Sequence, residues 1–196
     1  MRSRWSCVAA LAGGIVVGTV APAGAQVTGC PYREGSDPSA RPSPLDSVTF
    51  KVGGSDVRVC YSRPSARGRT MIGGENVPYG QVWRTGANET TKIMSAAALR
   101  VGGIEVPAGM HALYTVPGES EWQIIVNRSH EQWGAERTYT DEVKAQELGR
   151  TTVKAERLDD HIEAFTIRAE PQADGSANLV LEWEHTRVRV PITVKK

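Results

Sequence analysis

The sequence predicts an all-β protein, an antiparallel β-sandwich or jelly roll of roughly nine strands with one short helix. Apolar and polar residues alternate in many short runs, which is the pattern of strands with one buried face. Glycine and proline, with 20 and 11 residues, separate these runs at short intervals, as turns do in antiparallel sheets. Only residues 141–148 have a helical pattern, about two turns long.

Two pairs of adjacent glycines predict hairpins. Residues 48–52 and 57–61 alternate between apolar and polar types, and Gly53 and Gly54 lie between them. Residues 99–106 repeat this arrangement around a second glycine pair. Glycine adopts the positive φ angles of tight hairpin turns without a steric penalty, so we expect an antiparallel hairpin at each place.

The later strands are indicated by the same alternation. Residues 110–116 and 122–127 form two further predicted strands, joined by a proline and glycine turn. Residues 177–183 and 188–194 alternate again near the end of the chain. Pro191 places the last of these strands at an edge of the sheet, because proline has no amide donor for a neighbouring strand.

The first 25 residues have the layout of a secretory signal peptide. A basic start with Arg2 and Arg4 precedes an apolar stretch at 8–20, and an Ala-Gly-Ala cleavage pattern ends at Ala25. The apolar stretch has about 13 residues, too few to cross a bilayer core roughly 30 Å thick. We therefore expect an exported protein, periplasmic or extracellular, with no transmembrane segment.

The rest of the chain divides into two predicted parts. Residues 26–44 are rich in proline, serine, glycine and charge, and predict a flexible arm. Alternation begins at Leu45, and no repeat or change of composition follows it. Residues 45–196 are therefore predicted to form a single β-sandwich domain.

Two cysteines, Cys30 and Cys60, remain after the predicted cleavage. An even number in an oxidising compartment predicts a disulfide, which would tie the arm to the strand that contains Cys60. The alternative is a lipid anchor, because residues 27–30 resemble a bacterial lipobox in which Cys30 is lipidated. Six residues separate this motif from the apolar stretch, which favours the disulfide.

The charge balance limits the classes of partner. Lys and Arg number 23 and Asp and Glu number 22, which gives a formal charge of +1. Neither a broad basic surface for nucleic acid nor a polybasic membrane patch is expected from this balance. Basic residues are nevertheless concentrated locally, since residues 57–84 contain five arginines and a single acidic residue.

The long connection between residues 61 and 90 is the candidate binding site. It has roughly 25 residues, and connections of this length inside compact domains are usually functional or disordered. Arginine forms planar, two-pronged hydrogen bonds with carboxylate or phosphate groups, and tryptophan offers a platform for a sugar ring. We expect a small polar or anionic ligand, or a glycan. The candidate contacts are Arg63, Arg67, Arg69, Trp83, Arg84, Asn88, Glu89 and Trp133.

Two other functions remain open at this point. In the first, the protein is a structural envelope module whose arginines only pair internally and whose Trp83 belongs to the core. In the second, it is an enzyme, hydrolytic or metal-dependent and cupin-like. Glu182 and Glu184 lie two apart on one strand, as paired carboxylates of a glycoside hydrolase could, although Arg187 and Arg189 also suit them as cross-strand partners.

No cofactor or metal ligand set is predicted. The four histidines are scattered, and neither HxH nor HExxH occurs. Residues 106–111, with Pro107, Gly109 and His111, are faintly similar to the second cupin motif, but the chain lacks the other ligands of a cupin site.

Five segments together carry a family resemblance. They are residues 61–69 (YSRPSARGR), 78–91 (PYGQVWRTGANETT), 107–122 (PAGMHALYTVPGESEW), 133–135 (WGA) and 179–192 (LVLEWEHTRVRVPI). From about residue 41 to the end, the chain resembles a bacterial family of secreted domains of unknown function, the one numbered 2911. The resemblance implies an exported β-rich domain and implies no activity. The family usually has a small or aromatic residue in place of His111, which argues against a functional role for this histidine.

Overall fold

The computed structural model of the protein describes residues 29–32, 37, 40–133 and 138–195. The predicted signal peptide, residues 1–25, lies outside these residues. The described part of the chain forms nine strands and one helix. The elements are β1 (Leu45–Val52), β2 (Ser55–Ser62), β3 (Thr91–Ser95), β4 (Leu99–Val101), β5 (Ile104–Val106), β6 (Gly109–Val116), β7 (Glu121–Asn127), α1 (Asp141–Lys144), β8 (Glu147–Pro171) and β9 (Ala177–Val194).

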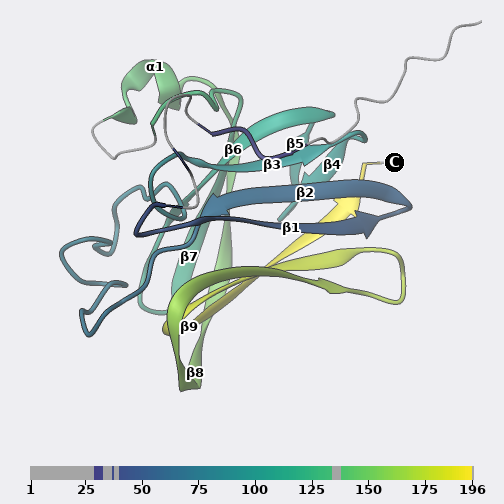
Figure 1. Cartoon of the computed structure of the whole chain (residues 1–196). Helices are drawn as coiled ribbons and strands as arrows, with labels where there is room; N and C mark the ends of the chain where they lie inside the picture. Colours follow the sequence, from purple (N-terminus) through teal and green to yellow (C-terminus); the bar gives the residue numbers. More distant parts are fainter. Residues whose placement is uncertain (1–28, 33–36, 38–39, 134–137, 196) are drawn as a thin grey trace, which may run out of the picture.

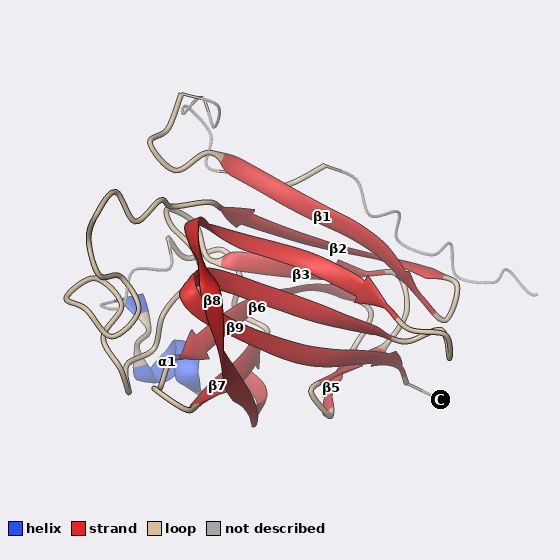
Figure 2. Ribbon diagram, turned by 90° about the horizontal axis from the view of Figure 1, so that it is seen from below, coloured by secondary structure: helices blue, strands red, loops and turns tan. Residues whose placement is uncertain are grey.

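The nine strands join in one antiparallel sheet with the order β1-β2-β3-β6-β7-β8-β9-β4-β5. The sheet doubles back on itself through β8 and β9, which have 25 and 18 residues. Residues 147–154 of β8 pair with β7, whereas residues 155–171 pair with β9. In Figures 1 and 2 the β8–β9 hairpin lies across the layer formed by β1, β2, β3 and β6. The predicted all-β fold class is confirmed.

Irregular pairing marks the bend in the long hairpin. The register of β8 against β9 shifts twice between Arg157 and Thr166, which indicates bulges on the longer strand. On β9, Glu184 has a positive φ of 51°, a left-handed conformation that non-glycine residues rarely adopt. Its carboxylate accepts hydrogen bonds from the backbone amides of Met71 and Ile72, at 3.0 and 2.7 Å. Through Glu184, the bend therefore fixes the long β2–β3 connection at Met71 and Ile72.

Aromatic side chains fill the centre of the core between the two layers. Trp83, from the β2–β3 connection, stacks on Trp183 with ring centroids 5.8 Å apart. It also meets Trp122 and Phe165 in edge contacts, at 6.1 and 5.0 Å. Its indole nitrogen donates to the carbonyl of Gly86 at 3.1 Å. Burial of a large apolar side chain stabilises a fold by roughly 1.5–3 kcal/mol, so Trp83 fixes the connection to the core.

The predicted helix over residues 141–148 is confirmed as a helix but is shorter than predicted, because α1 ends at Lys144. The side-chain amide of Asn127 donates to the carbonyl of Val143 at 2.7 Å, and the amide of Arg128 donates to the carbonyl of Gln146 at 3.0 Å. These bonds lead the chain into pairing with β7, so residues 147 and 148 begin β8 instead of continuing the helix. Figure 2 shows α1 beside β7 at one end of the sheet.

The individual strands agree with the sequence pattern only in part. Both glycine-pair hairpins are confirmed as β1–β2 and β4–β5. The two strands predicted at 177–183 and 188–194 are one continuous strand, β9. The pattern did not predict β3 or β8. All five residues of β3 are buried, so this strand does not alternate. In β8, partly buried and exposed residues alternate between residues 149 and 156, but its partly buried positions include Gly149 and Thr151, so the sequence lacks a regular apolar face there.

Candidate functional site

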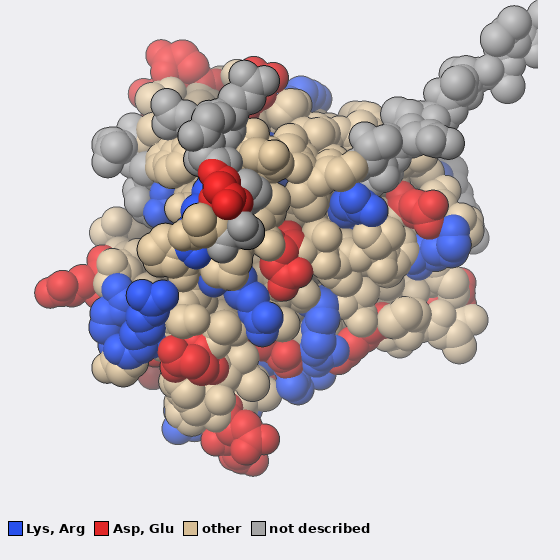
Figure 3. Space-filling model, in the orientation of Figure 1, with Lys and Arg blue, Asp and Glu red and all other residues tan. Residues whose placement is uncertain are grey.

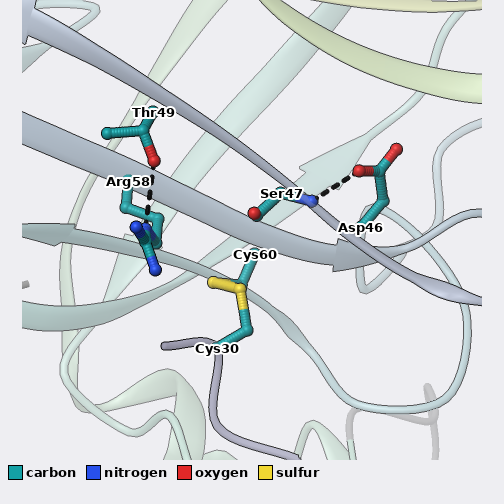
Figure 4. Close-up of a disulfide and its surroundings, with 6 residues drawn as sticks. All are labelled: Cys30, Asp46, Ser47, Thr49, Arg58 and Cys60. Carbon is teal, nitrogen blue, oxygen red and sulfur yellow. Dashed lines mark hydrogen bonds between the residues drawn. A yellow bond between two sulfur atoms is a disulfide. The ribbon is translucent and has the colours of Figure 1, made fainter. Parts of the chain in front are cut away.

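A disulfide joins the N-terminal arm to the sheet. Cys30 and Cys60 are bonded, with their Cα atoms 5.6 Å apart, as predicted. Figure 4 shows the bond on the face of β2, beside the hydrogen bond from Arg58 to Thr49. A Cys30 sulfur that forms this bond has no thiol to carry the alternative lipid anchor. The disulfide therefore places the residues that follow Cys30 over the outer face of β2 and β3.

The next described part of the arm, residues 40–44, lies in the predicted Arg-rich site. The guanidinium of Arg41 forms a two-pronged ion pair with the carboxylate of Glu89, at 2.6 and 2.9 Å. Both side chains are about nine-tenths buried, with 10% and 11% exposure. A buried pair of this geometry is expensive to break, because the remaining partner would be a buried unpaired charge.

Three further predicted contacts bind backbone groups of the same arm segment. Arg67 donates from its guanidinium to the carbonyl of Pro42 at 3.1 Å. Asn88 donates from its side-chain amide to the carbonyl of Ser43 at 3.1 Å. The backbone amide of Arg63 donates to the carbonyl of Pro44 at 2.8 Å. Much of the hydrogen-bonding capacity that the sequence assigned to a ligand is thus used by the protein's own arm.

The other predicted arginines bind within the fold or are partly buried. Arg69 donates to the carbonyls of Ala66 and Ser65, at 2.9 and 3.1 Å, and so closes its own loop. The side chain of Arg63 donates to the hydroxyl of Thr166 at 2.9 Å. Arg84 is half-buried, and its Nε has no hydrogen-bond partner among the described residues. None of these arginines lines the cavity described next.

A cavity of about 430 Å³ lies elsewhere, on the outer face of β3 and β6. Residues 31 and 32, which we call the arm tip, border it on one side. Residues 130–133, which follow β7, border it on the other. We call it the arm cavity. Its lining residues are Pro31, Tyr32, Glu89, Lys92, Met110, His130, Glu131, Gln132 and Trp133. Two of the eight predicted contacts, Glu89 and Trp133, line the arm cavity.

Lys92 is the unusual residue of the arm cavity. It lies on β3, with Cys60 and Ala112 as its partners in the neighbouring strands, and only 7% of it is exposed. Within the described part of the chain, no hydrogen bond or ion pair holds its ammonium group. Burial lowers the pKa of Lys92, and the carboxylates of Glu89 and Glu131 partly oppose that shift.

Aromatic side chains border the cavity on both sides. Tyr32 follows Cys30 closely in the arm and is 48% exposed. Trp133, on the opposite side, is half-buried. The segment that ends at Trp133 is fixed to the sheet, because Gln132 donates to the hydroxyl of Tyr114 and to the carbonyl of Ser129, the latter at 3.0 Å. The wall formed by this segment is therefore held against β6.

The paired carboxylates of the enzyme alternative have structural partners. Glu182 is buried, and Arg168 and Arg187 both donate to its carboxylate, the former at 3.0 Å to each oxygen. Burial opposes ionisation, but these two arginines lower the pKa of Glu182. Glu184 binds the backbone of the β2–β3 connection, as described above. Figure 3 shows acidic and basic side chains interspersed on one face of the molecule.

The histidines and carboxylates do not form a metal centre in the described part of the chain, where no group of three or more metal-binding side chains is found. His111 lies on β6 and is 6% exposed. Its Nδ1 has no hydrogen-bond partner among the described residues. Burial, together with the nearby His130 and Arg128, lowers the pKa of His111. Its burial therefore disfavours the charged form of this histidine.

A family model described as a protein of unknown function, DUF2911, matches residues 43–192. The chain belongs to the DUF2911 family. No curated protein and no solved structure matches it significantly. Among the described residues of this DUF2911 chain, no helix has the length and apolar character needed to cross a membrane. The family match includes every lining residue of the arm cavity except Pro31 and Tyr32, which belong to the arm.

Seven lining residues were not predicted from the sequence: Pro31, Tyr32, Lys92, Met110, His130, Glu131 and Gln132. One signal was present: Lys92 is a lone charge beside the apolar pair Ile93 and Met94, which is unusual for an exposed position. The expected Cys30–Cys60 bond also placed residues 31 and 32 near β2. The sequence did not indicate that β3 pairs with β2, and this pairing brings Lys92 beside Cys60.

Proposed function

We propose that the protein binds a small organic anion in the arm cavity, and that the ammonium of Lys92 receives the negative charge. The observation that carries this proposal is a nearly buried lysine, at the edge of a cavity, without a hydrogen-bond or ion-pair partner in the described chain. An ammonium group has three donors and is strongly hydrated in water. Burial of most of the side chain removes part of that hydration, and an anion in the cavity would replace it.

The neighbouring charges support an anion over a cation. Glu89 also borders the cavity, but its carboxylate already forms a two-pronged pair with Arg41. Glu131 is exposed, so water screens its charge. Among the described residues that line the cavity, Lys92 is thus the buried charged residue without a direct ion-pair partner. Its positive charge favours a negatively charged ligand.

The test is to titrate the purified, oxidised protein with acetate, succinate and benzoate while following thermal unfolding. A ligand that binds only the folded protein raises the unfolding temperature. We expect a rise with at least one of the three anions in the wild type, and no rise in Lys92→Met. Lys51→Met is the matched control, because Lys51 is an exposed lysine on β1 with 67% side-chain exposure.

Two results would contradict the proposal. One is the absence of any response to the three anions in the wild type. The other is an equal response in Lys92→Met and in the wild type. The circular dichroism spectrum of each variant, recorded before titration, shows that a lost response comes from the site and not from misfolding.

We also propose that the protein is exported, to the periplasm or the exterior of the cell. The layout of residues 1–25 and the Cys30–Cys60 disulfide support this location, because disulfides persist in oxidising compartments. The mass of the protein recovered outside the cytoplasm is expected to correspond to a chain that begins at Gln26. A chain that retains residues 1–25 would overturn this proposal, and a chain that begins at a lipidated Cys30 would overturn the cleavage after Ala25.

A further inference from the structure

We infer that the ligand of the arm cavity is an aromatic carboxylic acid, whose carboxylate meets Lys92 and whose ring lies between Tyr32 and Trp133. This inference rests on the anion site proposed above and names the class of anion. It follows from the number of buried charges, from the two aromatic walls and from the size of the cavity.

The charges of the cavity fit a single negative group. Lys92 is the only buried cation among the lining residues, since Arg41 lies outside the lining and is paired with Glu89. Phosphate esters and nucleotides carry two or more charges and are usually held by several cations or by backbone amides at a helix N-terminus. A carboxylate carries one charge and matches one ammonium.

The walls of the cavity fit a flat apolar body. Tyr32 is one of two large apolar residues that are strongly exposed in the described chain, the other being Tyr79. Tyr32 is nevertheless held in place, because the disulfide fixes the chain two residues before it. Trp133 borders the opposite side, and Met110 adds a polarisable side chain. Aromatic rings pair favourably with one another in edge or offset-stacked contacts, and methionine sulfur does so with ring edges.

The size of the cavity fits the same ligand class. A volume of about 430 Å³ lies at the lower end of the range of small-molecule sites, which is roughly 300–1,000 Å³. One or two rings with a carboxyl group fit in such a space.

The experiment compares ligands that differ in one property. Benzoate and benzamide share the ring and differ in charge, whereas benzoate and cyclohexanecarboxylate share the charge and differ in aromatic character. Acetate, inorganic phosphate and glucose complete the set. Dissociation constants are measured by calorimetry or by NMR titration on the wild type, Lys92→Met, Tyr32→Leu and Trp133→Leu. Tyr79→Leu is the matched control, because Tyr79 is 47% exposed and does not line the cavity.

We expect benzoate to bind about threefold to tenfold tighter than cyclohexanecarboxylate, the range that one aromatic contact provides. Lys92→Met is expected to weaken benzoate about thirtyfold or more, and benzamide hardly at all. Tyr32→Leu and Trp133→Leu are expected to remove the preference for the aromatic ring, while Tyr79→Leu keeps it.

The possible failures are distinguishable. If acetate or phosphate binds as tightly as benzoate through Lys92, the aromatic inference is overturned and the anion site remains. If benzamide or glucose binds as tightly as benzoate, or if Lys92→Met keeps the affinity for benzoate, both the inference and the proposed anion site are overturned. The comparison of benzoate with benzamide needs no substitution, so it decides the matter even if a variant fails to fold.

Discussion

Lys92 and Glu182 are both buried charged residues, and their surroundings differ. Glu182 accepts hydrogen bonds from Arg168 and Arg187, so its charge is compensated within the fold. Lys92 has no such partner among the described residues. A compensated buried charge serves the structure, whereas an uncompensated one lowers stability and calls for an external partner. Two equally buried charged residues therefore have different roles here: Glu182 stabilises the fold, and Lys92 is the candidate contact for a ligand.

Replacement of Lys92 by methionine is expected to stabilise the free protein by about 1 kcal/mol, because an apolar side chain of similar length removes the cost of partly desolvating the ammonium group. The folded-state pKa of Lys92 lies below its unfolded value. Between these two values the unfolded chain binds more protons, so wild-type stability rises with pH in that window. Urea unfolding at neutral and alkaline pH measures both effects. A variant that is less stable than the wild type at neutral pH would contradict this expectation.

His111 gives the protein a sensitivity to acid. Its pKa in the folded protein lies below the unfolded value of about 6.5, because it is buried near His130 and Arg128. Above that value the histidine is neutral in both states, and stability is unaffected. As the pH falls below it, the unfolded chain gains a proton that the folded protein does not, so stability decreases. Urea unfolding between pH 7.5 and 5 is expected to show a smaller loss in His111→Gln than in the wild type.

At the scale of elements, the arm is part of the site and also part of the scaffold. Its tip borders the arm cavity, and residues 41–44 occupy the Arg-rich connection through Arg41 and three backbone carbonyls. From the sequence, this connection was predicted to bind a small polar or anionic ligand or a glycan. The sequence did not show that a segment of the same chain binds there, because the contact from Arg41 to Glu89 spans 48 residues.

Loss of the arm disulfide is expected to affect both stability and binding. The bond closes a loop with a sequence separation of 30, for which chain entropy gives roughly 3–4 kcal/mol of stabilisation. The double variant Cys30→Ala/Cys60→Ala is expected to lose about that much in urea unfolding. It is also expected to bind benzoate more weakly, because Pro31 and Tyr32 are no longer held beside Lys92. Unchanged affinity in a folded double variant would show that the arm tip is not a wall of the site.

Strands with local signals were predictable, and strands defined by distant partners were not. Both glycine-pair hairpins have their turn and both strands within a few residues, so alternation and turn chemistry identify them. β3 is buried on both faces because the arm and the segment after β7 cover its outer side, and this cover removes the alternation. For the same reason, the sequence did not mark Lys92 as a site residue.

At the scale of the whole molecule, the two layers share a strand. β8 pairs with β7 through its first part and with β9 through its second, and the core between the layers is continuous. Neither layer can lose its structure without exposing the core of the other. We propose on this ground that residues 45–196 fold as one domain, as the sequence predicts.

One cooperative unfolding transition is expected for the oxidised protein. Far-UV circular dichroism reports the sheet, and tryptophan fluorescence reports the core around Trp83, Trp122 and Trp183. The two signals are expected to change with the same midpoint in urea. Separate midpoints would mean that part of the sheet unfolds independently, and would contradict a single domain.

The sequence alone determined the all-β class, the two tight hairpins and the Cys30–Cys60 pair, because each depends on local patterns or on residue counts. It also predicted a polar, arginine-rich connection. Only the tertiary structure decided that the arm fills much of that connection, that Trp83 is core, and that the cavity lies over Lys92. These features depend on contacts between segments far apart in the chain, and such contacts are set by the packing of the whole sheet and not by any local pattern.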